Sequence, residues 1–321
     1  MMKVFLMPFF VCFAFLSNAQ DSIPNPQDAQ GYQQLLFLLT KAASETENSL
    51  LKEHFETVMY FAQDTTHGFK PGAEDYKWAS ESLSYFDSIG LNWETYLNEP
   101  RPLMLSFISP SDGLRSYYWL VLPKNYDSTK KDYPLYFELH GSGGGSNNNP
   151  RKMIFQPLQP DLKGVATGGS RKEGFWVFPW GRGDKGYRDQ AEKDVLEALA
   201  DFDSRFKTDP TRQYLYGFSM GGMGTLKMYP MTKERWSAIA SYSGALRDAD
   251  LEKAKEYVSV PVWIAWGSEE RWADGNRQIR DLFIEAGVKD FEWTEVEGVG
   301  HKYLGEYQEK MLDWLNEHEK K

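Results

Sequence analysis

Hydrophobic and polar positions follow two different patterns along the chain, and the change between them falls near residue 100. Before it, apolar residues recur at helical spacing over 31–63 and again over 75–97, with a turn-rich segment between the two stretches. After it, short apolar runs alternate with amphipathic segments. We therefore expect a helical N-terminal appendage over 20–100 and a main domain over 101–321. The appendage is interpreted as a packing layer over one side of the main domain, with a cover for a substrate cleft or a partner surface as the alternative.

The main domain begins with a predicted antiparallel hairpin, because residues 103–109 and 114–123 have strand patterns that flank a polar turn. Strands and helices then alternate, which predicts an α/β fold with a mostly parallel sheet covered by helices on both faces. Functional residues in such folds lie in the loops that leave the carboxyl ends of the strands. The predicted strands are 133–139, 174–180, 212–218, 236–244, 260–267 and 290–296, and the predicted helices are 189–206, 219–229, 275–286 and 304–318.

The first 19 residues have the pattern of a secretory signal peptide. Lys3 precedes an apolar run from Val4 to Leu16, and the small residues Ser17 and Ala19 predict cleavage after Ala19. The run is shorter than the ~20 residues that span a bilayer, so a membrane anchor is not expected. We therefore expect a secreted or periplasmic protein with no integral membrane segment after cleavage.

Charge and cysteine content exclude several classes of partner and site. The net charge of −10 gives no basic surface for nucleic acid or for an anionic membrane. The only cysteine, Cys12, lies in the predicted signal peptide, which leaves no thiol for a disulfide, a nucleophile or a metal site. The five histidines are not clustered and no HExxH motif is present, so we expect neither a metal nor an organic cofactor.

The segment GFSMGG, residues 217–222, places Ser219 between a predicted buried strand and a predicted helix. A sharp corner of this kind strains the serine backbone and needs small flanking residues, which Gly217, Gly221 and Gly222 supply. The N-terminus of the helix also directs positive potential toward an anion that forms beside the serine. These features predict that Ser219 is a nucleophile.

A serine nucleophile needs a base and an acid that orients the base. In this architecture the base comes from a loop after the last strands, which leaves His301 and His318. His301 lies in a glycine-rich loop, whereas His318 lies at the end of the final helix, so we expect His301 to be the base. The acid is expected in the loop GSEERWAD after the preceding strand, where Glu269, Glu270 and Asp274 are all candidates.

Acyl transfer also needs backbone N–H donors for the oxyanion of the tetrahedral intermediate. The amide of Met220, directly after the serine, is one expected donor. The loop LHGSGGGSNNN, residues 139–149, follows an early strand, and its glycines allow the backbone to approach a substrate closely. We therefore expect Gly141 and Ser142 to supply the other donor. The loop has no GxxxxGK[ST] pattern, which argues against phosphate binding.

Six segments, in their order and spacing, resemble the α/β-hydrolase superfamily: LHGSGGG, FPWGRGDKGY, DVLEALADF, RQYLYGFSMGGMGT, WIAWGSEE and EGVGH. The resemblance extends over about 103–315. It is to the secreted esterase branch, which contains feruloyl and acetylxylan esterases, polyhydroxybutyrate-depolymerase-like proteins and predicted peptidases related to prolyl oligopeptidase. It implies an α/β-hydrolase fold with Ser219 as nucleophile, His301 as base and 140–142 in the oxyanion loop.

The resemblance also implies a position for the acid. In these families the acid is commonly an aspartate three residues after a strand-ending glycine, and the position three residues after Gly267 holds Glu270. Glutamate takes this role in some hydrolase triads. Glu270 is therefore the first choice for the acid and Asp274 is the second.

These expectations predict an exported serine carboxylesterase that cleaves acyl esters through an acyl-enzyme, on a small-molecule or polysaccharide substrate of acetyl or feruloyl type. Trp180, Trp266 and Trp272 lie near predicted loops and are expected to stack on sugar or phenolic rings, and His140 is a further candidate substrate contact. A serine peptidase of the prolyl-oligopeptidase type is one alternative, although a short helical appendage cannot form the β-propeller such enzymes usually carry. A noncatalytic binding protein on a hydrolase scaffold is the other.

Overall fold

The structure is a computed structural model that describes residues 29–152, 172–246, 249–302 and 305–320. The predicted signal peptide, with its cleavage site and Cys12, lies outside the described residues. Within the described part of the chain, no helix combines the length and the hydrophobicity that crossing a bilayer requires.

A single eight-stranded sheet forms the centre of the protein, with the strand order β1-β2-β4-β3-β5-β6-β7-β8. The strands are β1 (Leu103–Ile108), β2 (Arg115–Val121), β3 (Leu135–Leu139), β4 (Phe175–Pro179), β5 (Gln213–Phe218), β6 (Ala238–Tyr242), β7 (Val262–Gly267) and β8 (Phe291–Val296). Strand β2 runs antiparallel to both β1 and β4, and every other pair of neighbours is parallel. The predicted α/β fold with a hairpin followed by a mostly parallel sheet is confirmed.

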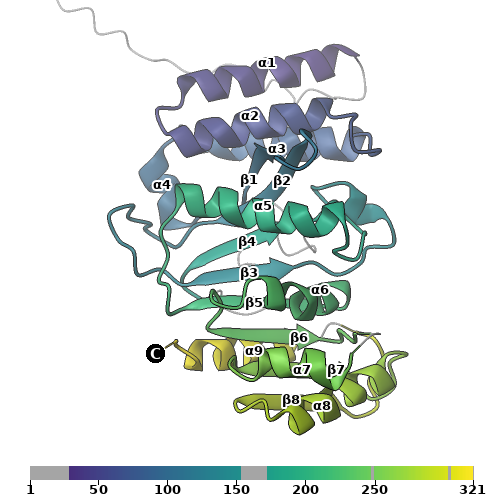
Figure 1. Ribbon diagram of the computed structural model, residues 1–321. Coiled ribbons are helices and arrows are strands. Elements are labelled where there is room, and N and C mark those ends of the chain that lie inside the picture. The colour runs from purple at the N-terminus through teal and green to yellow at the C-terminus, as the bar shows by residue number, and fades with distance from the viewer. Residues whose placement is uncertain (1–28, 153–171, 247–248, 303–304, 321) are drawn as a thin grey trace, which may run out of the picture.

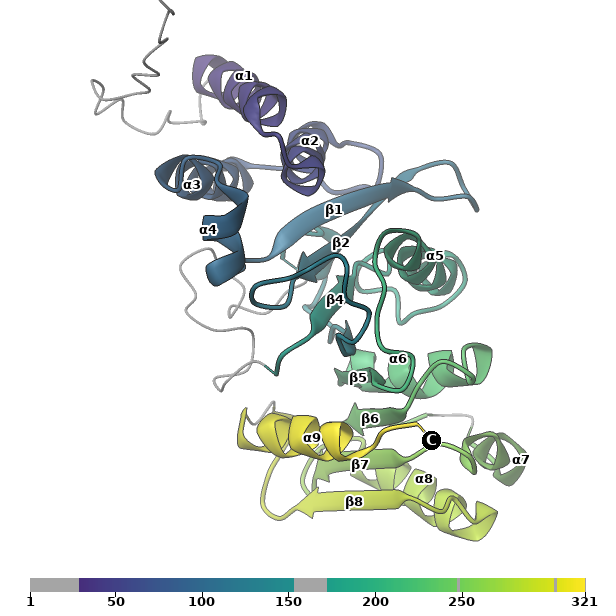
Figure 2. The same cartoon turned by 90° about the vertical axis from the view of Figure 1, so that its left-hand side faces the viewer.

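Helices cover both faces of this sheet, as Figure 2 shows. Helices α5 (Gln190–Arg205), α6 (Met220–Met228), α7 (Leu251–Ala254) and α8 (Ala273–Ala286) lie on one face, and α9 (Gly305–Glu317) lies on the other. The inner strands are accordingly buried on both sides; every residue of β6 and β7 is buried. Continuous apolar runs, rather than alternating ones, are what a sheet covered on both faces requires. The sheet is therefore a rigid base for the loops at its carboxyl edge.

The chain before residue 100 forms four helices where the sequence predicts two helical stretches. They are α1 (Ala29–Glu45), α2 (Ser49–Gln63), α3 (Ala73–Ser88) and α4 (Trp93–Asn98). The first stretch breaks at Asn48, whose side chain accepts the amides of Leu50 and Leu51 at 3.0 Å and so begins a new helix. The second breaks where Gly90 adopts φ 63° and the Asn92 side chain caps α4. Side chain caps therefore override the continuous apolar spacing.

These four helices pack against the β1 edge of the sheet, with α1 outermost in Figure 1. The amide of Met104 in β1 donates to Nδ1 of His54 in α2 at 3.0 Å, and Nε2 of His54 lies 3.3 Å from the hydroxyl of Ser82 in α3. His54 is fully buried, and the buried residues of the helices and the sheet form one continuous core. The helices thus cover an edge strand that would otherwise present unpaired backbone groups.

The buried His54 predicts an acid-sensitive attachment of these helices. Burial lowers the pKa of His54 to about 4, whereas a histidine in the unfolded chain titrates near 6.5. Between these values the unfolded chain binds a proton that the folded chain excludes, so the free energy of unfolding falls as the pH falls from about 6.5 to 4. One pKa unit corresponds to about 1.4 kcal/mol, so the loss reaches about 3 kcal/mol.

A His54→Gln variant keeps an acceptor for the Met104 amide but does not titrate. We expect the free energy of unfolding of this variant, measured with urea, to exceed that of the wild-type protein by an amount that increases steadily as the pH falls from 7 to 4.5. Parallel pH profiles for the two proteins would contradict a neutral, buried His54.

Candidate active site

Ser219 is the single residue between the end of β5 and the start of α6, and its backbone is strained. Its φ of 58° and ψ of −116° lie outside the regions that L-residues ordinarily occupy. The Ser219 amide donates to the carbonyl of Tyr242 at 2.7 Å, and its own carbonyl accepts the amide of Met223 at 3.0 Å. Backbone strain of this kind persists only where the surroundings fix it, and it is concentrated at functional sites.

Glycines beside Ser219 allow two other segments to touch this corner. A β-carbon at Gly221 would lie 1.8 Å from the carbonyl oxygen of Leu139, and one at Gly217 would lie 2.5 Å from the same oxygen. A β-carbon at Gly222 would lie 2.8 Å from the carbonyl oxygen of Tyr242. The end of β3 therefore contacts the first turn of α6 directly, which no larger residue would permit.

The corner serine begins a chain of hydrogen bonds that connects three loops. Ser219 Oγ lies 2.8 Å from Nε2 of His301, and Nδ1 of His301 lies 2.9 Å from Oε2 of Glu270. The Glu270 side chain is fully buried, whereas the His301 side chain is 34% exposed and its ring stacks on Phe218 at 5.1 Å. A hydroxyl, an imidazole and a buried carboxylate in this order can transfer the serine proton to the ring and stabilise the resulting imidazolium.

Backbone contacts between the loops after β7 and β8 set the distance between Glu270 and His301. The Glu269 amide donates to the carbonyl of Val299 at 2.9 Å. A β-carbon at Gly267 would lie 2.1 Å from that same carbonyl oxygen, so only glycine allows the two loops to lie this close. The strand-ending glycine that marked the acid in the sequence thus has a steric role as well.

Asn276, a residue that the sequence reasoning missed, fixes the second oxygen of Glu270. Its side chain amide donates to Glu270 Oε1 at 2.8 Å and is only 2% exposed. The buried face of α8 consists of Ala273, Asn276, Ile279 and Phe283. A polar residue at a position where the helical pattern predicts an apolar one was therefore the available signal.

Asp274, the second candidate for the acid, points away from His301. Its side chain is 99% exposed and pairs with Arg277 at 2.7 Å on the outer face of α8. Glu270 is the carboxylate that the fold brings to the imidazole, because its turn faces the loop of His301 whereas the first turn of α8 faces solvent at Asp274.

The predicted oxyanion donors lie on either side of the same corner. Met220 is the first residue of α6, and Gly141 and Ser142 follow the end of β3. Within the described segments, no residue accepts a hydrogen bond from the amide of Ser142 or of Met220. Both amides thus keep a donor available for a substrate oxygen.

Three predicted substrate contacts are corrected by their burial. Trp180 and Trp266 are 1% and 0% exposed, because both side chains pack into the core at the ends of their strands. His140 is 5% exposed, and its two ring nitrogens lie 2.9 Å from the carbonyl oxygens of Gly141 and Trp180. Burial lowers the pKa of His140. Its buried ring connects the loop after β3 to the end of β4 and does not face a substrate.

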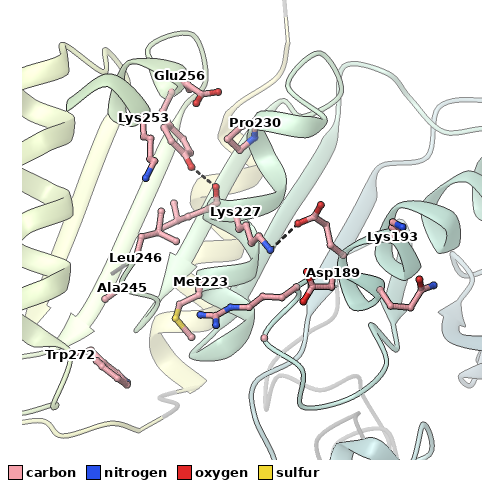
Figure 3. A pocket seen from close by; sticks show the side chains of 16 residues that line it. Asp189, Lys193, Met223, Lys227, Pro230, Ala245, Leu246, Lys253, Glu256 and Trp272 are labelled. Atoms are coloured by element: carbon pink, nitrogen blue, oxygen red, sulfur yellow. Dashed lines mark hydrogen bonds and ion pairs between the residues drawn. The ribbon is translucent and has the colours of Figure 1, made fainter. Parts of the chain in front are cut away.

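Trp272 is the one predicted aromatic contact that reaches an open surface. It is partly exposed and lines a groove of about 1460 Å³ that also contains Met223 and Lys227 of α6. Figure 3 shows Trp272 at one end of this groove and Lys193 at the other. Of the lining residues, Met223 is one helical turn after Ser219 in α6 and Trp272 follows Glu270 by two residues in the sequence.

Comparison with known families places the chain in a known group. Residues 116–282 match the family model described as “Putative esterase”. This range contains the corner serine and Glu270. A search of curated proteins gives no match to the chain.

Several solved structures are similar in fold. A thermostable esterase aligns with a TM-score of 0.54 and 20% identity over 70% of this chain, which spans 64% of that protein's length. A ferulic acid esterase aligns with a TM-score of 0.52 and 18% identity, covering 68% of this chain and 97% of the other. The feruloyl esterase module from Clostridium thermocellum aligns with a TM-score of 0.51 and 18% identity, covering 70% and 90%. The fold that the sequence resembles is therefore shared.

The contact between Gly221 and Leu139 predicts the effect of one added methyl group. In Gly221→Ala the new β-carbon would meet a backbone oxygen that cannot rotate away, so β3 or α6 must move. We expect a loss of about 3 kcal/mol or more in the free energy of unfolding, measured with urea. Gly300→Ala is the matched control, because Gly300 also flanks the site but nothing lies within 4 Å of its would-be β-carbon. Equal stability of the two variants would show that the close approach is not rigid.

Proposed function

Because the chain belongs to the esterase family and is a carboxylic ester hydrolase, we propose that Ser219, His301 and Glu270 form its catalytic triad. The single observation that carries this proposal is the continuous hydrogen-bond chain of 2.8 Å and 2.9 Å through the imidazole. Its order matches the roles of nucleophile, base and orienting acid. The strained, glycine-flanked backbone of Ser219 supports the same assignment.

In the proposed reaction, Ser219 Oγ attacks the ester carbonyl while His301 Nε2 takes the hydroxyl proton. Glu270 holds Nδ1 of His301, so that Nε2 faces the serine, and stabilises the positive ring that forms. The tetrahedral intermediate collapses when the imidazolium returns the proton to the leaving alcohol. Water then attacks the acyl-enzyme while His301 takes its proton. The imidazolium returns this proton to Ser219 Oγ as the acyl bond breaks, which releases the acid and restores the serine.

The oxyanion of both tetrahedral intermediates is proposed to receive hydrogen bonds from the amides of Met220 and of the segment Gly141–Ser142. The N-terminal end of α6 adds its positive potential at the same point. Donors of this kind, fixed before the reaction starts, stabilise the transition state by roughly 3–4 kcal/mol each.

The proposed substrate is an acyl ester of acetyl or feruloyl type on a polysaccharide-derived alcohol. The groove of about 1460 Å³ that Met223 and Trp272 line exceeds the ~300–1,000 Å³ of a site for a drug-sized ligand, which supports a large alcohol group. Trp272 offers a partly exposed ring for stacking on a sugar or a phenolic acid. Two proteins of similar fold carry the names ferulic acid esterase and feruloyl esterase, and the second was solved with sinapinate.

Export of the protein remains part of the proposal. It rests on the signal-like pattern of residues 1–19 and agrees with a polymer substrate that would be met outside the cell. The helical segment over 20–100 is proposed as a packing layer, because α2 covers the edge strand β1 at some distance along the sheet from the loops of the triad.

The test of the triad is ester hydrolysis by the purified protein without residues 1–19. We expect it to hydrolyse p-nitrophenyl acetate, and Ser219→Ala to lower kcat by at least about 10³-fold with an unchanged melting temperature. Ser204→Ala, which removes an exposed hydroxyl from α5, should match wild type. Retention of activity by Ser219→Ala would reject the mechanism. Comparison of acetylated xylan with methyl ferulate would then identify the preferred acyl group.

The acid is tested by a matched pair of isosteric changes. Glu270→Gln should lower kcat by about 10³–10⁴-fold, because the amide no longer stabilises the imidazolium or fixes its tautomer. Asp274→Asn should change kcat by less than about twofold, because the Asp274 side chain is 99% exposed. Both rates are measured with p-nitrophenyl acetate at pH 8, and the reverse ranking would move the acid to α8.

A further inference from the structure

The loop between β4 and α5, residues 180–189, contains an unusual concentration of left-handed backbone. Its residues with positive φ are Gly181 (53°), Arg182 (56°), Gly183 (80°), Gly186 (67°), Tyr187 (51°) and Asp189 (53°). Three of them are not glycine, and such residues cost of order 1–3 kcal/mol each. Backbone strain on this scale indicates that the surroundings hold the loop in one shape.

Buried polar contacts supply that constraint. The Arg182 side chain is only 9% exposed and donates to Asp194 at 2.6 Å, to His67 at 3.0 Å and to Asp112 at 3.2 Å. At the other end of the loop, Nζ of Lys227 in α6 donates to the carbonyl of Tyr187. The loop is therefore attached to α5, to the turn between β1 and β2, and to the helix that follows Ser219.

This fixed loop in turn holds both ends of the proposed oxyanion segment. The Tyr187 hydroxyl donates to the carbonyl of His140 at 2.8 Å, just before the segment Gly141–Ser142. Just after the segment, the Asp184 carboxylate accepts the amide of Gly143 at 2.9 Å with one oxygen and the amide of Gly145 with the other.

The glycine-rich loop needs such an external attachment. Residues 142–146 are exposed, and Gly144 and Gly145 adopt φ values of 64° and 96°. A chain of glycines has more conformational freedom to lose than any other, and these glycines have no side chains with which to pack. A single carboxylate that accepts two amides restricts this freedom at the residue next to Ser142.

We propose that Asp184 is a positioning residue that holds the Ser142 amide in the oxyanion hole. The inference rests on the proposed function, because it assigns a role within the same reaction. Without Asp184, the segment keeps its contacts at His140 and at Gly141, whose carbonyl accepts the side chain amide of Asn147, but the amides of Gly143 and Gly145 lose their acceptor. The Ser142 donor is then misplaced for the oxyanion, whereas the hydrogen bonds among Ser219, His301 and Glu270 are unchanged. The negative charge that develops in the transition state is then less stabilised. Binding of the neutral ester is unchanged, because the ester carries no such charge.

The first experiment separates kcat from KM for p-nitrophenyl acetate. We expect Asp184→Ala to lower kcat by about 100-fold and Asp184→Asn, which keeps one acceptor oxygen, by about tenfold, with KM within threefold of wild type. Asp127→Asn is the matched control. The Asp127 carboxylate also accepts a backbone amide, that of Thr129, but it lies in the connection between β2 and β3 and should leave both constants unchanged.

The second experiment reports on the oxyanion hole directly, by comparing an ester with the corresponding thionoester. Sulfur accepts hydrogen bonds weakly, so the ratio of the two rates measures how much the backbone donors contribute. We expect this ratio to fall by up to about tenfold in Asp184→Asn and by up to about 100-fold in Asp184→Ala, and to stay constant in Asp127→Asn. A loss of folded protein would lower both rates equally and leave the ratio unchanged, so a ratio equal to that of wild type would overturn the proposal. If Ser219→Ala remains active, the proposed function itself fails. If Ser219→Ala is inactive but the Asp184 variants behave like the wild-type protein, only the role of Asp184 is rejected.

Discussion

The contact between the Leu139 carbonyl oxygen and the first turn of α6 determines the geometry of the whole site. It requires glycine at position 221, since a β-carbon there would approach the oxygen to 1.8 Å. It brings the end of β3, and therefore the segment Gly141–Ser142, to the same corner as Ser219 and the amide of Met220. The nucleophile and both sets of proposed oxyanion donors thus come from two adjacent parallel strands, whose register the backbone ladder between β3 and β5 fixes. Any displacement of one strand relative to the other would move the serine nucleophile away from the proposed oxyanion donors.

The buried Glu270 carboxylate is the other element that the surrounding structure must support. A buried ion is costly unless both oxygens are hydrogen-bonded, and here Asn276 occupies one oxygen and His301 the other. Glutamate suits this position because the chain turns tightly after β7: the Glu270 amide bonds to the Gly267 carbonyl at 3.2 Å, and α8 begins only three residues later. The additional methylene lets the carboxylate reach the imidazole from a turn that cannot extend further.

The spacing of apolar residues predicted the helices and strands of this protein better than it predicted where the side chains in the connecting loops would point. The strands of the main domain fall within their predicted ranges. For inner strands such as β6 and β7, burial on both faces produces apolar runs that have few other interpretations, whereas β8 has no buried residue. The long helical stretches before residue 100 were divided by caps at Asn48 and Asn92, which act locally and leave the apolar spacing intact. Trp180 and Trp266 lie close to loops in the sequence, but the direction of a side chain at a strand end depends on packing, which spacing does not encode. Asp184 could not be identified because the backbone amides that it accepts lie about 40 residues away in the sequence, whereas Asn276 left only the weak signal of a polar residue on the apolar face of a helix.

The distribution of backbone strain explains why the loops at the proposed site are the hardest part of the chain to predict. Of the seven non-glycine residues with positive φ in the described chain, five lie in the loops that leave the carboxyl ends of β4, β5 and β6, three strands in the parallel part of the sheet: Arg182, Tyr187, Asp189, Ser219 and Ser243. Each is unfavourable by of order 1–3 kcal/mol, and the buried sheet and its helices provide the stability that offsets them. A strained loop has no repeating pattern, since each residue takes its conformation from a specific tertiary contact. The edge of the sheet where chemistry is proposed is therefore the edge where local sequence preferences are overridden most, and its residues become visible only when the contacts that hold them are known.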